Sequence, residues 1–316
     1  MGEKAILFGP FIGEFFWEVA RFSFLVPYYR IKKYPNGKVK IIVLTREERF
    51  DLYASFSDIL VPLKIDGDYE KYQPNCYRLE GFPVEQYEKI ARKFYEKYSS
   101  KFQILEHVYP NIRGKKFLDK NQYDRSKMLC IFKPRPRNYF LVEERIPQDK
   151  PIVLLAPRYR RGFKRNWNGW KDFYDLLFKE KQLMKTFNFV IVGKPGEYVP
   201  DDKGRFYDMN DIPLDKNSSK CGILLALLDK CCFVCGSQSA IPNIALLFKK
   251  EVLEFGHQRY LHTKTYNWFN TPVTFLDDPR YSLEPLVLLN NLKKILSGGN
   301  RKWEMPGSQR MKKQLV

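Results

Sequence analysis

The densest group of cations in the sequence directly follows an apolar run. Five cations stand within eight residues of the chain: Arg158, Arg160, Arg161, Lys164 and Arg165. The run before them, PIVLLA at 151–156, has the composition of a buried strand, and guanidinium groups match phosphate oxygens in pairs. A charge run is more often a solvated surface, but such surfaces seldom begin where a buried strand ends. The loop therefore predicts phosphate binding by Arg158, Arg161 and Lys164.

A small polar turn after the apolar run 231–235 is a second candidate for phosphate binding. A helical apolar pattern begins directly behind this turn, whose residues are Gly236, Ser237, Gln238 and Ser239. Backbone N–H groups and hydroxyls at a helix start bind phosphate without a cation, while simple helix capping by a serine is the alternative. Because both loops fall in the same half of the chain, we expect them to form one diphosphate site.

Two further residues follow apolar runs in this half. Lys194 stands in a glycine turn behind the run 187–192, and His257 follows the run 251–255. The carboxyl ends of parallel strands meet at one edge of a sheet, so both side chains are predicted to reach the same phosphates or an attached sugar. An ordinary turn at Lys194 and a structural histidine at 257 are the alternatives.

A glycine-punctuated loop, GPFIGEFFWE at 9–18, connects the first strand-like run to the first helical pattern. Glu14 would stand at the helix start, where the helix dipole keeps a carboxylate ionised and ready to accept a proton from an acceptor hydroxyl. Gly13 and Trp17 are predicted to lie beside that acceptor. Capping of the helix by Glu14 is the alternative, and the loop lacks the third glycine of a dinucleotide-binding fingerprint.

Metal and cofactor chemistry finds little support in the sequence. Cys232 and Cys235 have CxxC spacing, but they lie in an apolar run with no second pair, which favours buried thiols over zinc ligands. Asp66 and Asp68 have the DxD spacing of metal-dependent sugar transferases, and a turn explains them equally well. We therefore expect neither a bound metal nor a cofactor.

Length and charge set further limits. The 316 residues suffice for about two domains. Lysine and arginine number 55 against 36 acidic residues, and a net charge of +19 favours an anionic partner such as nucleic acid, an anionic membrane surface or a nucleotide. Six dispersed cysteines, no long uncharged apolar window and no secretory signal predict a cytoplasmic protein without a transmembrane segment.

Strand-like and helix-like segments alternate along the chain. The expected strands are 4–8, 38–45, 59–63, 151–156, 187–192, 231–235 and 251–255. The expected helices are 15–26, 84–98, 170–182, 222–229, 241–248 and 283–296. This alternation predicts an α/β fold with doubly wound parallel sheets, covered by helices on both faces. A charged, proline-rich segment is expected to connect two domains near residue 148, and the stretch 101–138 has no assignment.

The motifs together resemble the glycosyltransferases of the GT-B fold, most clearly in PRYRR at 157–161, VGKPGE at 192–197 and CGSQSAIPNIALL at 235–247. The resemblance implies two Rossmann-like domains facing a central cleft. Residues 1–148 would bind the acceptor, 149–296 would bind a nucleotide-sugar co-substrate, and 297–316 would be a basic, flexible tail. It also implies Glu14 as the catalytic base. The paired glutamates of the retaining branch are missing, which favours an inverting, metal-independent transfer.

Three interpretations of the target remain open, two with a sugar acceptor and one without catalysis. The charge of +19 and the richness in lysine, tyrosine and phenylalanine resemble phage enzymes that glycosylate modified DNA bases, so a hydroxymethylated base in DNA is the leading prediction, with the host cytoplasm as its location. A glycolipid or polysaccharide, reached by peripheral contact with an anionic membrane, is the second. The third is a non-catalytic nucleic-acid-binding protein.

Overall fold

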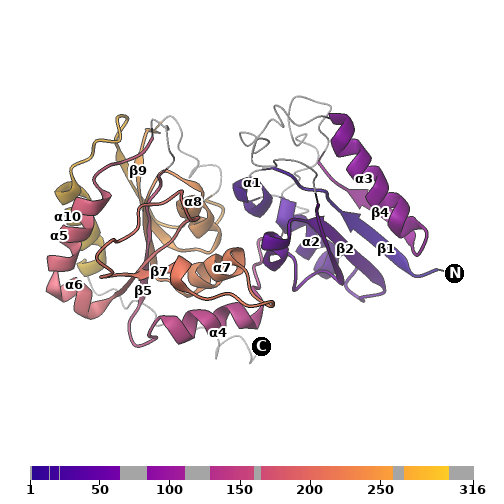
Figure 1. The fold of residues 1–316 in the computed structure, drawn as a ribbon, viewed down its shortest axis with the longest axis horizontal. Helices are drawn as coiled ribbons and strands as arrows, with labels where there is room; N and C mark the ends of the chain where they lie inside the picture. Colours follow the sequence, from indigo (N-terminus) through magenta and orange to yellow (C-terminus); the bar gives the residue numbers. More distant parts are fainter. Residues whose placement is uncertain are drawn as a thin grey trace. The chain divides into compact units, whose positions relative to one another are not determined.

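The chain forms two compact units, each built around its own parallel sheet (Figure 1). The computed structural model describes residues 2–13, 15–20, 22–64, 84–110, 129–159, 165–258 and 267–298. The units are Met1–Arg135 and Pro136–Val316, so the chain passes between them ahead of the predicted boundary near residue 148. Strands alternate with helices in both, which confirms the predicted α/β class. The predicted tail lies outside the described residues from 299 onward.

The first unit has a four-stranded sheet in the order β3-β2-β1-β4, with every neighbouring pair parallel. Its strands are β1 (Lys4–Phe8), β2 (Val39–Thr45), β3 (Ile59–Pro62) and β4 (Gln103–Val108). Its helical segments are α1 (Phe15–Ala20), η1 (Phe22–Phe24), α2 (Leu25–Tyr28), η2 (Tyr29–Lys33), η3 (Glu47–Leu52) and α3 (Val84–Ser99).

Both faces of β1 are buried, which explains its continuous apolar run. Ala5 and Leu7 pack with Phe94 of α3 on one face. On the other face the Phe8 ring lies edge-on to Phe22 at 6.4 Å between centroids. The carboxyl end of this central strand is therefore held from both sides, and the loop that begins at Gly9 starts from a rigid position.

Strand β4 went unrecognised in the sequence because it lies at the edge of its sheet. Its side chains are half-buried or exposed, and its apolar residues are interrupted by polar ones. One of these, Glu106, accepts a hydrogen bond from the Tyr29 hydroxyl at 2.7 Å. An edge strand with so many polar side chains lacks the apolar run on which the strand predictions depend.

The second unit has a six-stranded parallel sheet in the order β10-β9-β8-β5-β6-β7. Its strands are β5 (Ile152–Ala156), β6 (Asn188–Ile191), β7 (Tyr207–Asp208), β8 (Phe233–Ser237), β9 (Glu251–Gly256) and β10 (Val273–Asp277). Its helices are α4 (Pro136–Arg145), α5 (Trp170–Lys179), α6 (Lys181–Thr186), η7 (Met209–Asp211), α7 (Lys220–Lys230), α8 (Ala240–Leu247) and α10 (Pro285–Ser297).

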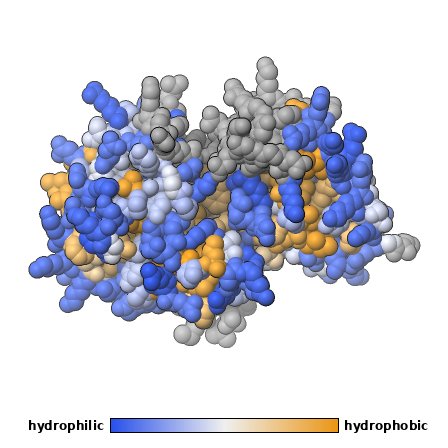
Figure 2. All heavy atoms as spheres, in the orientation of Figure 1, coloured by the Kyte–Doolittle hydropathy of each residue, from blue (hydrophilic) through white to orange (hydrophobic). Residues whose placement is uncertain are grey.

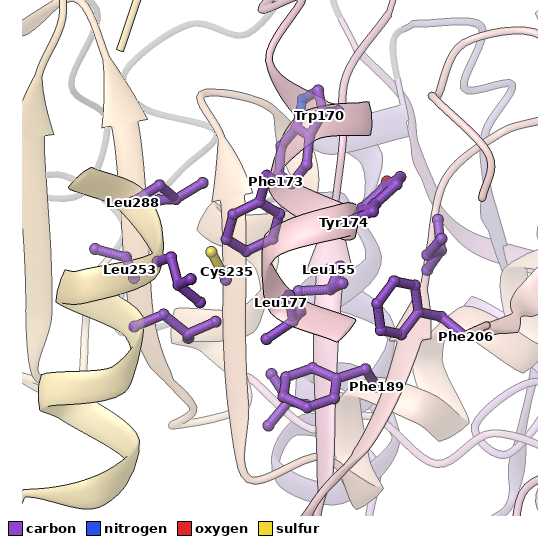
Figure 3. Close-up of a cluster of buried hydrophobic side chains, with 14 of the residues drawn as sticks. Leu155, Trp170, Phe173, Tyr174, Leu177, Phe189, Phe206, Cys235, Leu253 and Leu288 are labelled. Atoms are coloured by element: carbon purple, nitrogen blue, oxygen red, sulfur yellow. The ribbon is translucent and has the colours of Figure 1, made fainter. Parts of the chain in front are cut away.

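One face of this sheet carries an aromatic core (Figure 3). Leu155, Cys235 and Leu253, from three neighbouring strands, point toward α5 and α10. Helix α5 contributes a cluster of fully buried rings, among them Trp170 and Phe173 with centroids 5.7 Å apart. This packing fixes the three strands whose carboxyl ends carry the predicted phosphate loops.

Helix α4 corrects the sequence analysis, which assigned its residues to an inter-domain connection. It begins at Pro136, a position at which proline needs no N–H partner. Leu141 and Val142 are buried, and the Tyr139 hydroxyl donates to Asp229 on α7 at 2.7 Å. The charges of this segment lie on an amphipathic helix that belongs to the second unit and packs against α7, and they do not mark a linker.

The surface shown in Figure 2 is mostly hydrophilic, with scattered apolar side chains, as the high charge content leads one to expect. Within the described ranges, no helix combines the length and the apolar character that a bilayer crossing needs.

Candidate functional site

Three loops of the second unit leave the sheet at the same edge. Strands β5, β8 and β9 are parallel neighbours, with Ala156 beside Gly236 and Ser237 beside Phe255. Their carboxyl ends therefore lie together, and each continues into a loop that the sequence singled out. The first is the arginine loop after β5. The second is the turn 236–239, whose first two residues, Gly236 and Ser237, still belong to β8, so that the strand ends later than predicted. The third begins at His257 after β9.

Arg158 joins the arginine loop to the turn 236–239. Its backbone N–H donates to Ser237 Oγ at 3.2 Å, and its guanidinium donates to the main-chain oxygen of Gln238 at 3.0 Å. The two predicted phosphate-binding segments are thus in direct contact. Arg160, Arg161 and Lys164 lie outside the described residues, so the contact is carried by Arg158.

Gln238 is a buried link between loops. Its amide Nε2 donates to the His257 carbonyl at 3.2 Å, and its Oε1 accepts from the Tyr281 hydroxyl at 2.9 Å. Only 4% of the residue is exposed. Its side chain therefore positions the turn and the segment after β9, and its backbone N–H donates to the Phe255 carbonyl at 2.9 Å.

Close packing explains the two glycines at this edge. A Cβ at Gly236 would stand 2.8 Å from Ala156 Cβ, and a Cβ at Gly256 would stand 2.7 Å from Gln238 Cβ. Gly256 also has a φ of +151°, which disfavours any side chain there. Both glycines allow the three loops to approach one another.

Helix α8 begins at this turn without a side-chain cap. Ser239 is its N-cap residue and has extended backbone angles, but its hydroxyl makes no capping hydrogen bond. The Ser237 hydroxyl is fully buried and accepts from Arg158, so it is not a cap either. A helix start with this electropositive end and an arginine beside it suits an anionic group.

Lys194 and His257 flank the same edge. The Tyr159 N–H donates to the Glu197 carbonyl at 2.9 Å, which ties the glycine turn of Lys194 to the arginine loop. Lys194 is exposed and His257 is half-buried. Both predicted residues therefore come from loops that contact the residues around Arg158.

Positive charge reaches into the buried part of this cluster. Burial raises the pKa of the Tyr281 hydroxyl. The backbone of His257 and the charges of Arg165 and Arg158 lower this pKa. Tyr281 thus lies within electrostatic reach of two cations of the arginine loop. Arg165 was part of the predicted cluster, but Tyr281 carried no signal in the sequence.

Glu254 is a second residue that the sequence analysis missed. It is fully buried in β9, and neither carboxyl oxygen has a hydrogen-bond partner among the described residues. Burial raises the pKa of this carboxyl to about 8, partly opposed by the Ser239 backbone N–H. A single acidic residue between apolar neighbours, in VLEFG, was the available signal.

In the first unit, buried arginines hold the loop that leads to Glu14. Arg46 donates to the carbonyls of Ile12 and Gly13, each at 2.9 Å, and Arg49 donates to Gly13 at 3.2 Å. Glu14 itself and the side chain of Trp17 lie outside the described residues. Gly13 is buried, and the loop approaches the carboxyl end of β2 closely, since a Cβ at Gly9 would stand 2.2 Å from the Leu44 oxygen.

Glu18 anchors one of these arginines, Arg49. Its carboxylate is fully buried, pairs with Arg49, and accepts from Thr45 Oγ1 at 2.6 Å and from the Tyr53 hydroxyl at 2.8 Å. A buried charge with this many donors is fully compensated. The network fixes the loop up to Gly13.

The described residues contain no group of three or more side chains suited to a metal ion. Asp66 and Asp68 lie outside them. Burial raises the pKa of the Cys232 and Cys235 thiols, so both are protonated at neutral pH.

No protein-family model matches the chain, and no curated protein sequence matches it. Solved structures do. The E. coli ADP-heptose LPS heptosyltransferase II has 10% sequence identity and a TM-score of 0.52, over 93% of this chain and 98% of that one. The E. coli heptosyltransferase WaaC with ADP has 10% identity and a TM-score of 0.50, over 93% and 99%. The chain thus has the α/β fold with two parallel sheets that GT-B glycosyltransferases share.

Proposed function

We propose that the protein is a glycosyltransferase that uses a nucleotide-sugar donor. The observation that supports this most is the contact of Arg158 with the turn 236–239, beside a helix start without a side-chain cap. A guanidinium and several backbone N–H groups at one strand edge suit a diphosphate, which is the leaving group of a nucleotide sugar. The fold agrees, because it is one in which such enzymes occur.

The donor's diphosphate would lie over the start of α8, with Arg158 and Lys194 beside it. His257 would lie near the phosphates or the sugar, and Arg161 and Lys164 would add further positive charge. Gly236, Ser237 and Gln238 would contribute by shaping the turn, and Ser239 would contribute its backbone N–H at the start of α8. Fixed dipoles and cations in this arrangement stabilise the charge that develops on the departing diphosphate.

The chemical step transfers the sugar to an acceptor hydroxyl. The hydroxyl oxygen forms the new bond to the anomeric carbon while the bond from that carbon to the diphosphate breaks, and the electron pair leaves with the diphosphate. Glu14 would take the hydroxyl proton, with Gly13 and Trp17 beside the acceptor. A single displacement of this kind inverts the anomeric configuration and needs no metal, since protein cations neutralise the leaving group.

For the acceptor we propose a hydroxymethylated base in DNA, on the basis of the net charge of +19. The second candidate is a glycolipid, and the observation that favours it is a structural neighbour whose name specifies LPS. The two acceptors call for the same donor chemistry, so the donor can be tested first.

Calorimetric titration with a panel of nucleoside diphosphates tests the donor assignment. At least one nucleoside diphosphate should bind. When it is present at 100 times its Kd, it should raise the free energy of unfolding of the second unit by about 2.7 kcal/mol. Activity should persist in the presence of a chelator. If no nucleoside diphosphate binds, the proposal is wrong. If activity is lost to the chelator and returns with Mn²⁺ or Mg²⁺, the metal-independent step is wrong.

A further inference from the structure

A buried carboxyl group lies behind the proposed donor site. Glu254 stands beside Gly236 in the β8–β9 register, so it belongs to the strand next to the turn 236–239. Gly236 packs against Pro242 of α8 on this side, since a Cβ there would stand 3.1 Å from the proline ring. The Ser239 backbone N–H, at the start of α8, lies close enough to lower the pKa of the Glu254 carboxyl, although the two groups form no hydrogen bond by geometry.

Buried side-chain oxygens without a hydrogen-bond partner lie near this helix start. Both Glu254 oxygens and Asn243 Oδ1 are buried and without a partner among the residues that the structure describes. The Asn243 amide group, for its part, donates to the Ser239 carbonyl at 2.8 Å. A proton on Glu254 converts one of these acceptors into a donor, whereas an ionised carboxylate adds unpaired negative charge to a buried site.

We propose that Glu254 is a positioning residue of the donor site: in its neutral form it leaves the Ser239 N–H to the donor's diphosphate, and in its ionised form it takes that N–H and repels the diphosphate. This inference rests on the proposed function. An N–H that faces a carboxylate from behind is no longer directed at a phosphate in front of it, and a negative charge behind the helix start offsets the helix dipole.

Other titratable groups near Glu254 could also change nucleotide affinity with pH, so the test has to distinguish them from Glu254. Helix α8 has no charged residue, β8 brings Cys235, and β10 brings Asp277, which accepts from the Gln258 N–H at 3.0 Å. The Tyr281 hydroxyl interacts electrostatically with Glu254 as well as with Arg158 and Arg165. His257 and Glu251 lie at the two ends of the β9 segment.

The sign of the effect follows from the neutral state. Burial raises the pKa of Glu254 to about 8, so the carboxyl is neutral at pH 7 and ionises as the pH rises further. Because the bound complex holds Glu254 neutral, nucleotide affinity should fall as pH rises above 8 and binding there should take up a proton. The nucleotide's own terminal phosphate titrates near pH 6, well below this range.

The test compares nucleoside diphosphate binding by the wild type, Glu254→Gln and Glu251→Gln between pH 7.5 and 9.5. Wild type and Glu251→Gln should weaken by roughly 10-fold to 30-fold across this range, as expected for one ionisation near 8. Glu254→Gln, which cannot ionise, should change little. Calorimetry at pH 8.5 in buffers of different ionisation enthalpy should report an uptake of about 0.8 proton for the wild type and none for Glu254→Gln.

A measurement on the ligand-free wild type covers the case in which Glu254→Gln does not fold. With ¹⁵N-labelled serine, the Ser239 amide resonance should titrate with a midpoint near 8, because ionised Glu254 captures that N–H. A Ser239 amide that does not titrate overturns the inference. So do equal pH profiles for wild type and Glu254→Gln, which leave the donor assignment intact. Failure of every nucleoside diphosphate to bind overturns both proposals.

Discussion

The Arg158 guanidinium donates to the main-chain oxygen of Gln238 at 3.0 Å, and this hydrogen bond connects the end of β5 to the start of α8. Gln238 in turn reaches the carbonyl of His257 after β9. One arginine thus organises three loops at one sheet edge. Its proposed role has two parts, which are to hold the turn 236–239 in shape and to present positive charge to a phosphate.

Arg158→Ala should weaken nucleoside diphosphate binding about 10-fold to 150-fold, because a hydrogen bond to a charged group contributes roughly 1.5 to 3 kcal/mol. Arg161→Ala should act in the same direction. Calorimetry measures both effects. The matched control is Lys171→Ala on α5, whose exposed ammonium pairs with Asp202 at 2.8 Å on the surface. Unchanged nucleotide affinity in both arginine variants would refute the assignment of the donor site.

The arginine loop and the polar turn could be found from the sequence because each directly follows a continuous apolar run. The strand at 151–156 and the helix at 241–248 were likewise recognisable from apolar patterning alone. Strand β10 was not recognisable in this way, because it lies at the edge of the sheet and its residues are mostly half-buried. The start of β8 was predicted two residues early, since Cys231 ends α7 although it is as apolar as the strand.

The roles of side chains within the site were harder to predict. Gln238 looks like a ligand residue in sequence, but its amide points inward, and only the fold shows this. Arg46 and Arg49 belong to a charged stretch that resembles a solvated helix. Their burial depends on carbonyls of a loop more than 30 residues away, and no local pattern encodes such a contact.

Glu18→Ala should destabilise the first unit by about 3 to 5 kcal/mol, because it leaves the Arg49 guanidinium buried without its counter-charge. Hydrogen exchange of β1 and β2 amides measures this effect, while β5 amides of the second unit serve as an internal reference. Asp202→Ala is the matched control, because an exposed pair contributes less than about 1 kcal/mol. Equal protection of β1 in wild type and Glu18→Ala would contradict the role given to this network.

Glu14→Gln should keep nucleotide affinity and lose turnover by about 100-fold to 10,000-fold, the usual contribution of a general base. The arginine contacts to Ile12 and Gly13 are made by main-chain atoms before Glu14, so the substitution leaves them in place. Single-turnover sugar transfer is the measurement. A variant that retains more than a tenth of the wild-type rate would reduce Glu14 to a helix cap.

The acceptor proposal predicts that transfer to hydroxymethylated DNA exceeds transfer to unmodified DNA and to a membrane glycolipid fraction. Labelled nucleotide sugars offered to the three acceptors in parallel decide between them. Unmodified DNA is the matched control, since it has the same charge and lacks the hydroxyl. Transfer to the glycolipid alone would discard DNA and leave the donor chemistry untouched.

Salt dependence separates the two acceptors by a second route. Every phosphate contact made by a lysine or arginine releases a counterion, so affinity for DNA should fall steeply between 50 and 200 mM salt, by about 1,000-fold if six contacts form. A net charge of +19 supplies enough cations for such contacts, and a small neutral acceptor would gain nothing from it.

The target base must also leave the base stack before its hydroxyl can reach Glu14. Removing a base from the stack costs a few kcal/mol, and it costs less in single-stranded DNA. We therefore expect faster transfer to single-stranded than to duplex DNA at equal occupancy. Equal transfer rates to single-stranded and duplex DNA, together with a DNA affinity that does not change with salt concentration, would contradict a nucleic-acid acceptor.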